Sequence, residues 1–435
     1  MELSSQSTDM IRIHAPGRTA RHQAAFEWVL TSVLALEWTW EDNLDRYLNN
    51  DNGIRCHYGA TPDLPGIGFP AEGLLSQLGE KRPLPPEVVG AHADLFAAVF
   101  WMGSRMEEHL PNANRDVHGR FDPTDSVPFQ KGWLGQPICE TWAFVIGRRL
   151  LGEQMWKGHA AKLKSAYRVE ATLDVDSAYA FLGKGVMRTG GAAVRDVLRF
   201  NGRHLTRRLS TLMGKQADPY DTYDMASRWH KEFGLDVRWF FLLARFGSHD
   251  KGLPASSPRL ARLMRSLEED QGDQVHWHPG YASAFNGAAL REEYTSFEDI
   301  MGRPPLASRQ HYLRLELTAS RRRLLALGIR EDHTEGHAKV VGFRGGFARQ
   351  RRWYDLEAEA LTELELCPFS AMDATFLRHM KVPPESVPEE VSQLAAAVRE
   401  TGGPMRLLWH NESLAPEGQW QKWGGVYPAV LKALC

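Results

Sequence analysis

The fold of this chain is decided by the stretch Ala171-Thr172-Leu173-Asp174-Val175-Asp176-Ser177, which ends an apolar, strand-like run that begins at Tyr167. Side chains alternate between the two faces of a strand, so Asp174 and Asp176 would emerge on one face at its carboxyl end. Barrels and open α/β sheets carry their chemistry at that end. Two like charges this close are costly unless a cation or a shared proton relieves them. The pair therefore indicates a metal site or an acid/base site, with capping of the next helix as the alternative.

Length and charge set outer limits on the function. At 435 residues the chain favours two or three domains and can bury a large core. The 52 basic and 54 acidic residues leave a net charge of −2, which argues against polyanion binding driven by net charge. We therefore expect no nucleic-acid partner.

The sequence also carries information on compartment and redox chemistry. Residues 1–8 are polar, no basic segment leads into an apolar stretch of the secretory type, and no run reaches the roughly 18 apolar residues of a membrane span. We expect a soluble, cytoplasmic protein with no membrane span. No Cys-x-x-Cys pair occurs, so neither a disulfide framework nor a cysteine-based zinc site is supported by the four cysteines, Cys56, Cys139, Cys367 and Cys435.

The first part of the chain is predicted to be an α/β domain spanning residues 1–165. Its Pro- and Gly-rich region, 51–86, is expected to be largely loop. The charged segment 157–164 resembles the approach to a new domain, which puts the boundary near residue 165. The pattern predicts a strand at 10–13 and helices at 20–35, 94–110 and 140–151.

The second part, residues 166–435, alternates strand-like and helix-length stretches. Helices are expected at 258–269 and 319–327, among others. The alternation favours a parallel α/β barrel or partial barrel over a sandwich. The strand candidates are 169–175, 237–243, 275–278, 310–315, 328–331, 340–343, 363–368 and 405–410.

Polar side chains stand at several of these strand ends. His276 and His278 share one face of a strand before a turn, and His410 follows the last apolar run. A single histidine is usually a structural or surface group, but four polar strand endings in one domain favour a functional site. The remaining ending is Ser308-Arg309-Gln310-His311-Tyr312.

These motifs, in their order, resemble the polysaccharide deacetylase domain, also called the NodB homology domain of carbohydrate esterase family four. Thr172-Leu173-Asp174-Val175-Asp176 is similar to its opening Thr-Phe-Asp-Asp-Gly motif, and Gln274-Val275-His276-Trp277-His278 to its metal-histidine motif. Arg309-Gln310-His311-Tyr312 resembles the Arg-x-Pro-Tyr motif, and Leu407-Leu408-Trp409-His410 the closing Leu-x-Leu-His motif. The first part resembles the uncharacterised domain that precedes such deacetylase-like domains in some bacterial proteins, through 104–108 and 116–121.

The resemblance implies a distorted (β/α) barrel of NodB type that removes an N- or O-linked acetyl group from a sugar or glycan with the help of a divalent metal, zinc being the best fit. Carried over by position, Asp174 would be the general base, His278 a metal ligand and His410 the acid that protonates the leaving group. Arg309 would orient the base, and the backbone amide near Tyr312 would help to hold the oxyanion.

Two departures from the family pattern concern the metal. Val175 stands where the family has its metal-binding aspartate, so the carboxylate moves to Asp176, and Ala282 stands where its second metal histidine falls. Either His276 or His311 could supply the missing nitrogen ligand. If neither reaches the ion, a catalytically silent glycan-binding protein is the alternative. A metal-independent hydrolase of non-sugar C–N bonds on the same scaffold is another.

Further residues are assigned to the substrate or set aside. We expect the groove to be shaped by Tyr312, Asp332, Arg344, Trp409 and Glu412. The i, i+4 histidines of His333-Thr334-Glu335-Gly336-His337 are discounted as a helical zinc site because Gly336 lies between them. The basic stretch 195–215 is interpreted as a solvated helix face, with an anionic glycan carrier as the alternative partner.

Overall fold

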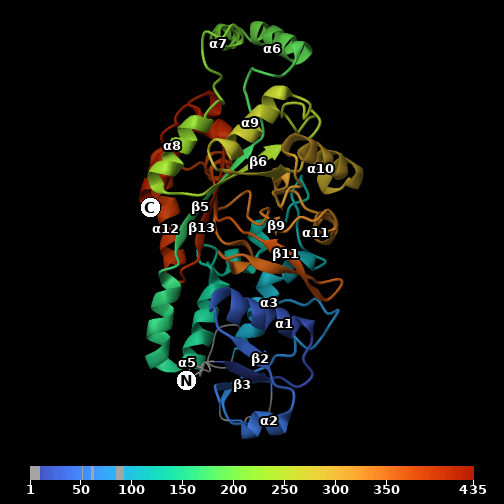
Figure 1. Ribbon diagram of the computed structural model, residues 1–435, viewed down its shortest axis with the longest axis vertical. Coiled ribbons are helices and arrows are strands. Elements are labelled where there is room, and N and C mark those ends of the chain that lie inside the picture. The colour runs from blue at the N-terminus through green and yellow to red at the C-terminus, as the bar shows by residue number, and fades with distance from the viewer. Residues whose placement is uncertain (1–9, 51, 60–62, 85–92) are drawn as a thin grey trace, which may run out of the picture.

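A small parallel sheet organises the N-terminal part of the molecule. The structure is a computed structural model that describes residues 10–50, 52–59, 63–84 and 93–435. The sheet has the order β2-β1-β3-β4 and lies at the foot of the molecule in Figure 1. Its strands are β1 (Ile11–His14), β2 (Trp38–Trp40), β3 (Ile54–Tyr58) and β4 (Ile67–Phe69), and its helices are α1 (Ala20–Phe26), α2 (Leu44–Asn49), α3 (Leu95–Gly103), α4 (Val127–Gln130) and α5 (Ile138–Lys164).

The region 51–86 was expected to be largely loop, and in its described residues, 52–59 and 63–84, it is loop apart from the short strands β3 and β4; the other residues of that region lie outside the described ranges. Other expectations for this part need correction. The helix expected at 94–110 ends at Gly103, because Arg105 takes a left-handed backbone conformation with φ 55°. The charged segment 157–164 is the last part of α5, which bends where Gly152 leaves helical geometry with φ 67°.

The second part is built on a nine-stranded sheet of order β10-β11-β9-β8-β7-β6-β5-β13-β12. All neighbouring strands pair in parallel except β10 with β11. The strands are β5 (Arg168–Val175), β6 (Val237–Leu242), β7 (Gln274–His278), β8 (Ala307–Ser308), β9 (Glu331–Asp332), β10 (Arg351–Asp355), β11 (Ala360–Leu366), β12 (Ala371–Met372) and β13 (Pro404–His410). The α/β class and the smaller N-terminal α/β domain are confirmed.

Helices surround this sheet in Figure 1, and two of them stand apart at the top. The sheet curves strongly, since Arg238 on β6 pairs with Glu331 on β9, three strands away in the order. The carboxyl ends of its strands therefore converge. The helices are α6 (Val186–Leu198), α7 (Gly202–Leu212), α8 (Tyr223–Phe233), α9 (Pro258–Glu269), α10 (Gly287–Met301), α11 (Leu317–Ala326), α12 (Val387–Arg399) and α13 (Val426–Leu434).

Two of the expected strands are wrong. Within residues 310–315, His311–Leu313 form a short 3-10 turn, in which Tyr312 and Leu313 have φ values of 61° and 54° that a strand cannot accommodate. Residues 340–343 are irregular because the backbone N–H of Phe343 donates to the Leu134 carbonyl of the N-terminal part. Strands β10 and β12 were not anticipated. The expected strand 328–331 is shifted, since β9 begins at Glu331.

The two parts of the chain share a core. Phe347, Tyr354 and Leu356 of the second part pack within the apolar core of the first. Buried ion pairs also cross between them, including Arg344 with Glu108 at 2.7 Å. The boundary predicted at residue 165 falls between α5 and β5. No helix in the described ranges is long and apolar enough to cross a bilayer.

Candidate metal centre

A cavity of about 410 Å³ opens at the carboxyl ends of the central strands. Its floor comes from β5, β7 and β13, and its walls come from the loops that follow β6, β8 and β12. Ligand sites in α/β sheets lie in this position because the polar ends of adjacent strands converge there. The charged and imidazole groups of the lining are His118, Arg120, Asp174, Asp176, His249, Lys251, His278, His311, Arg378, His379, His410 and Glu412.

Three of these side chains form a cluster that could hold a metal ion. One potential ligand atom from each of Asp176, His278 and His311 lies within 4.8 Å of the others. His278 Nε2 is 3.3 Å from one oxygen of Asp176, and His311 Nε2 is 3.3 Å from the other. One carboxylate and two imidazoles are a donor set that suits a divalent transition metal.

Hydrogen bonds behind the cluster set the direction of both imidazoles. His278 Nδ1 donates to the Arg309 carbonyl at 2.5 Å, and His311 Nδ1 donates to Asp250 at 2.8 Å. Each bond directs the Nε2 atom toward Asp176, as metal-binding histidines require. His278 Nε2 and Asp176 Oδ1 are buried and have no hydrogen-bond partner within the described chain. Two unpartnered polar atoms that face one another fit a divalent cation.

The negative charge of Asp176 is balanced by the proton that His311 carries, and a bound cation would replace that proton. Burial lowers the pKa of His311, but the charge of Asp176 and the hydrogen bonds to Asp176 and Asp250 outweigh it and raise that pKa to about 9. Burial opposes ionisation of Asp176, yet His311 and His278 hold its pKa well below the usual range. A metal bound here must displace a proton from His311, so metal affinity should rise with pH.

A second carboxylate lies beside the cluster and is held by a buried arginine. Arg309 donates to Asp174 and to the Thr172 hydroxyl, both at 2.7 Å, and its Nε donates to the His333 carbonyl. Asp174 Oδ2 is 3.7 Å from His278 Nε2. Arg309 and Asp174 are almost completely buried. This carboxylate is therefore fixed next to the ion position and oriented by a charge-assisted bond.

His410 faces the same cavity and has a carboxylate partner of its own. Its Nδ1 lies 2.7 Å from Asp373 Oδ1, and its backbone N–H donates to the other oxygen of Asp373. Burial lowers the pKa of His410, but the charge and the hydrogen bond of Asp373 outweigh burial and raise it to about 10. The imidazole is thus a proton donor throughout the neutral pH range.

The backbone of the loop after β8 is strained at the edge of the cavity. Tyr312 and Leu313 both have positive φ, which is costly for residues other than glycine. Leu313 N–H donates to the Gln310 carbonyl, whereas Tyr312 N–H has no acceptor in the part of the chain that the structure describes. A free N–H at this position could receive a negatively charged oxygen.

The N-terminal part contributes one wall of the cavity. His118 contacts Tyr281 through Nδ1 at 3.1 Å and packs on Tyr312, with ring centroids 5.0 Å apart. His249 stacks on Tyr281, with centroids 3.8 Å apart. Arg120 donates to the Tyr312 carbonyl at 3.1 Å and so supports the strained loop. The two parts of the chain therefore build one site with an aromatic wall.

The structure brings together most of the predicted site residues. Asp174, Asp176, His278, His311, Tyr312, His410 and Glu412 line the cavity, and Arg309 lies directly beneath it. Of the two alternatives for the missing nitrogen ligand, His311 joins the cluster. His276 does not: it is buried below the site against Phe240, and burial lowers its pKa to about 3.

Three expected groove residues lie elsewhere. Arg344 donates two hydrogen bonds to the carboxylate of Glu108 and so forms a bidentate ion pair between the two parts of the chain. Trp409 is buried against Tyr427, because it lies on the face of β13 opposite His410. Asp332 pairs with Arg321 at 3.1 Å in the interior.

Sequence reasoning missed Asp250, Asp373 and His118. The first two carboxylates follow β6 and β12, so the strand-end rule that identified Asp174 could have found them. Asp373 was hidden because β12 has only two residues. His118 lies in another part of the chain, and no local pattern connects it with the nine-stranded sheet.

A second group of potential ligands already holds a cation. Glu331, His333 and Cys367 lie close enough to bind a metal. The Arg238 guanidinium pairs with Glu331 and lies 3.0 Å from His333 Nε2. This arginine occupies the place of an ion, so we do not assign a metal there.

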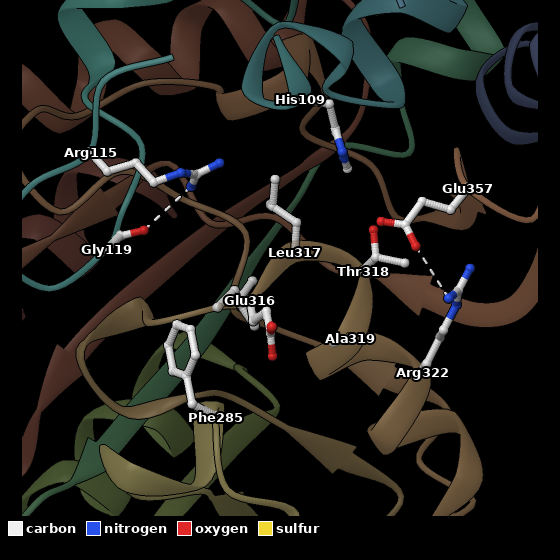
Figure 2. Close-up of a pocket in the computed structure, with 11 residues that line it drawn as sticks. His109, Arg115, Gly119, Phe285, Glu316, Leu317, Thr318, Ala319, Arg322 and Glu357 are labelled. Atoms are coloured by element: carbon white, nitrogen blue, oxygen red, sulfur yellow. Dashed lines mark hydrogen bonds and ion pairs between the residues drawn. The ribbon is translucent and has the colours of Figure 1, made fainter. Parts of the chain in front are cut away.

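A larger cavity of about 710 Å³ lies away from the cluster, beside the start of α11. Figure 2 shows its two arginines engaged at opposite sides, Arg115 with the Gly119 carbonyl and Arg322 with Glu357. Its polar groups therefore do not converge on a common point, and its chemistry is less specific than that of the metal cluster.

Comparisons with known proteins give a family for the first part of the chain and low-identity likenesses for the second. Residues 11–154 match a family of unknown function, DUF7033, which confirms the expected uncharacterised N-terminal domain. No curated protein matches.

Among solved structures, a protein assigned as a polysaccharide deacetylase from Mycobacterium smegmatis is 14% identical with a TM-score of 0.40, covering 62% of this chain and 85% of that one. One assigned likewise from Pseudomonas aeruginosa PAO1 is 12% identical with a TM-score of 0.39, covering 62% and 85%. The Puue allantoinase is 11% identical with a TM-score of 0.39, covering 62% and 84%. At such values the chemistry of this chain rests on its own side chains.

Proposed function

We propose that this protein is a metal-dependent hydrolase that removes an N- or O-linked acetyl group from a sugar or glycan precursor. The observation that carries the proposal is the convergence of Asp176, His278 and His311 beside Asp174, with both imidazoles oriented from behind. A divalent cation bound there, with zinc the best match to the donor set, would polarise the acyl carbonyl and lower the pKa of a water molecule.

The protein's own groups account for the proton transfers. Asp174, oriented by Arg309, would accept a proton from the attacking water. His410 carries its proton at neutral pH and would donate it to the leaving amine or alkoxide. The backbone N–H of Tyr312 would stabilise the negative charge that develops on the acyl oxygen.

The walls of the cavity support a sugar as the substrate. Aromatic rings present flat apolar faces that suit the C–H faces of a pyranose, and three such rings, His118, His249 and Tyr312, line the cavity, with Tyr281 packed against them. We further propose a cytoplasmic location, in which the substrate would be a soluble or carrier-linked precursor.

One observation favours a second candidate, a metal-independent hydrolase of C–N bonds. With His311 protonated, its positive charge lies 3.3 Å from Asp176 and 2.8 Å from Asp250, so the charge of Asp176 in the cluster is compensated without a cation. In that mechanism the protonated imidazole of His311 would polarise the carbonyl group of the substrate. The aromatic wall by itself would also serve a catalytically silent glycan-binding protein.

Metal content separates these possibilities. We would measure zinc and other divalent metals in the purified protein and in an Asp176→Ala/His278→Ala variant, both expressed with added metal. Near-stoichiometric metal in the parent that is lost in the variant supports the proposal. Release of acetate from acetylated sugars, with His410→Ala as the inactive control, then tests the reaction. A parent protein that stays free of metal after reconstitution would contradict the metal-dependent mechanism.

A further inference from the structure

The helical hairpin formed by α6 and α7 presents an apolar face to solvent. Figure 1 shows both helices standing clear of the body of the molecule. Of the 21 large apolar side chains that are exposed in the described residues, nine belong to residues 186–213. Met187, Leu198 and Phe200 are 91%, 73% and 97% exposed. Such a concentration is far from the scattered apolar residues of an ordinary surface.

The apolar residues of each helix share one side. Met187, Val194 and Leu198 recur along α6 at spacings of seven and four, and Leu205, Leu209 and Leu212 recur along α7 at four and three. Both patterns describe an amphipathic helix. The core of the protein should cover such a face, yet here it is turned outward.

Polar side chains attach the hairpin to the body. Arg188 donates to the carbonyls of Lys251 and Gly252 at 3.0 and 2.9 Å. Arg207 pairs with Glu417, and Arg208 lies over the Phe181 ring at 4.7 Å while also pairing with Asp196. The usual arrangement is inverted, because Arg188, Arg207 and Arg208 contact the body of the protein while the apolar groups face outward. This inversion indicates that the outer face meets an apolar phase.

The charge of the hairpin identifies that phase. Residues 186–213 contain six arginines and one acidic residue, Asp196, which is already paired with Arg208. The chain as a whole has 52 basic and 54 acidic residues, so positive charge is concentrated here. Arg195 and Arg199 make no ion pair among the described residues and flank the apolar face. A second copy of the same face would bring arginines together and be repelled, whereas anionic lipid head groups would attract them.

We propose that the α6–α7 hairpin docks the protein on the surface of an anionic lipid membrane. The apolar side chains would insert at the boundary between head groups and acyl chains, and the arginines would contact the head groups. The hairpin follows β5, and Arg188 contacts Lys251 at the rim of the cavity. Docking would therefore hold the cavity close to the membrane. The inference holds whatever reaction the cavity performs.

Flotation of the full-length protein with vesicles tests this proposal. We expect binding to vesicles of phosphatidylcholine mixed with phosphatidylglycerol, weaker binding in high salt, and little binding to phosphatidylcholine alone. Met187→Ser/Leu198→Ser/Phe200→Ser should abolish binding. The matched triple Leu78→Ser/Val145→Ser/Met155→Ser, which removes exposed apolar side chains elsewhere, should bind as the parent does. Arg195→Glu/Arg199→Glu should weaken binding by about fivefold or more for each arginine.

Three outcomes would overturn the proposal. The first is equal binding of the parent to neutral and anionic vesicles. The second is equal binding by the two triple variants, each checked for folding by its thermal unfolding. The third combines two results: the parent does not bind vesicles, and sedimentation velocity shows a parent dimer that the variant Met187→Ser/Leu198→Ser/Phe200→Ser converts to a monomer. That outcome would assign the apolar face to self-association.

Discussion

His410 Nδ1 lies 2.7 Å from Asp373 Oδ1, and the same aspartate accepts the backbone N–H of His410 through its other oxygen. One carboxylate therefore fixes both the position and the charge of the imidazole. The pKa of His410 rises to about 10 because the negative charge of Asp373 stabilises the protonated form more than burial destabilises it. An acid that the sequence alone would place near pKa 6.5 is thus available at neutral and mildly alkaline pH.

Replacing Asp373 should shift the alkaline limb of the activity profile. A general acid works only below its pKa, so with Asp373→Asn we expect the limb to move from near pH 10 toward pH 6.5. At about pH 8.5 the rate of acetate release should fall by about 100-fold, while at about pH 6 it should change little. A pH–rate profile of the parent and the variant measures the position of the limb and the rates at these two pH values. A uniform loss at all pH values would instead indicate damage to the site.

Asp250 should control metal affinity without being a ligand. Its carboxylate holds His311 Nδ1 at 2.8 Å, and loss of such an outer partner typically weakens metal binding by about 10–100-fold. We expect Asp250→Asn to lose zinc to a chelator at a correspondingly lower concentration. Asp355→Asn, which removes a carboxylate paired with Arg322 far from the cavity, is the control. Equal affinities of the two variants would show that His311 is not a ligand.

The buried pair of Arg309 and Asp174 should be coupled in stability. Arg309→Met leaves Asp174 charged and buried without its main partner, which should lower the free energy of unfolding by about 3–5 kcal/mol. Asp174→Asn added to Arg309→Met should recover part of that loss because no uncompensated charge remains. Denaturant unfolding of the two single variants and the double variant gives the coupling free energy. Additive losses would contradict the pairing.

His118 should affect substrate binding rather than the chemical step. It belongs to the aromatic wall that the N-terminal part contributes, and it contacts none of Asp174, Asp176 and His410. We expect His118→Ala to raise KM about two- to tenfold with kcat nearly unchanged. Val117→Ala, at the exposed neighbouring position, should leave both constants as they are. A fall in kcat with constant KM would place His118 in the proton transfers instead.

Glu108 should make the junction of the two parts sensitive to acid. Burial raises the pKa of this carboxyl, but Arg105 and Arg344 outweigh burial and lower it to about 2, from the ordinary value of 4.5. Its contribution of about 3 kcal/mol is therefore present above pH 4.5 and is lost as the pH falls toward 2. Glu108→Gln should cost about that much at pH 7 and much less near pH 3, in denaturant unfolding. A difference that does not vary with pH would contradict this account.

Local patterns were sufficient for the central strands and for the residues at their ends. The runs that form β5 and β13 are long, with eight and seven residues, and period-two alternation puts Asp174 with Asp176 on one face whatever lies around them. The choice between His276 and His311 was beyond such patterns. His276 lies two positions before His278 in β7, which places its ring farther from the carboxyl end of the strand, whereas the turn after β8 carries His311 into the cavity.

The amino-acid sequence by itself determined the alternation of strands and helices, the two-part organisation, and the carboxylates and imidazoles at the strand ends, because each depends on the spacing of neighbouring residues. Tertiary structure decided the rest. It selected Asp250, Asp373 and His118 as partners of the site and removed Arg344 and Trp409 from it. It also turned the apolar faces of α6 and α7 toward solvent. These features depend on contacts between residues far apart in the chain, and spacing along the sequence carries no information about which distant groups will meet.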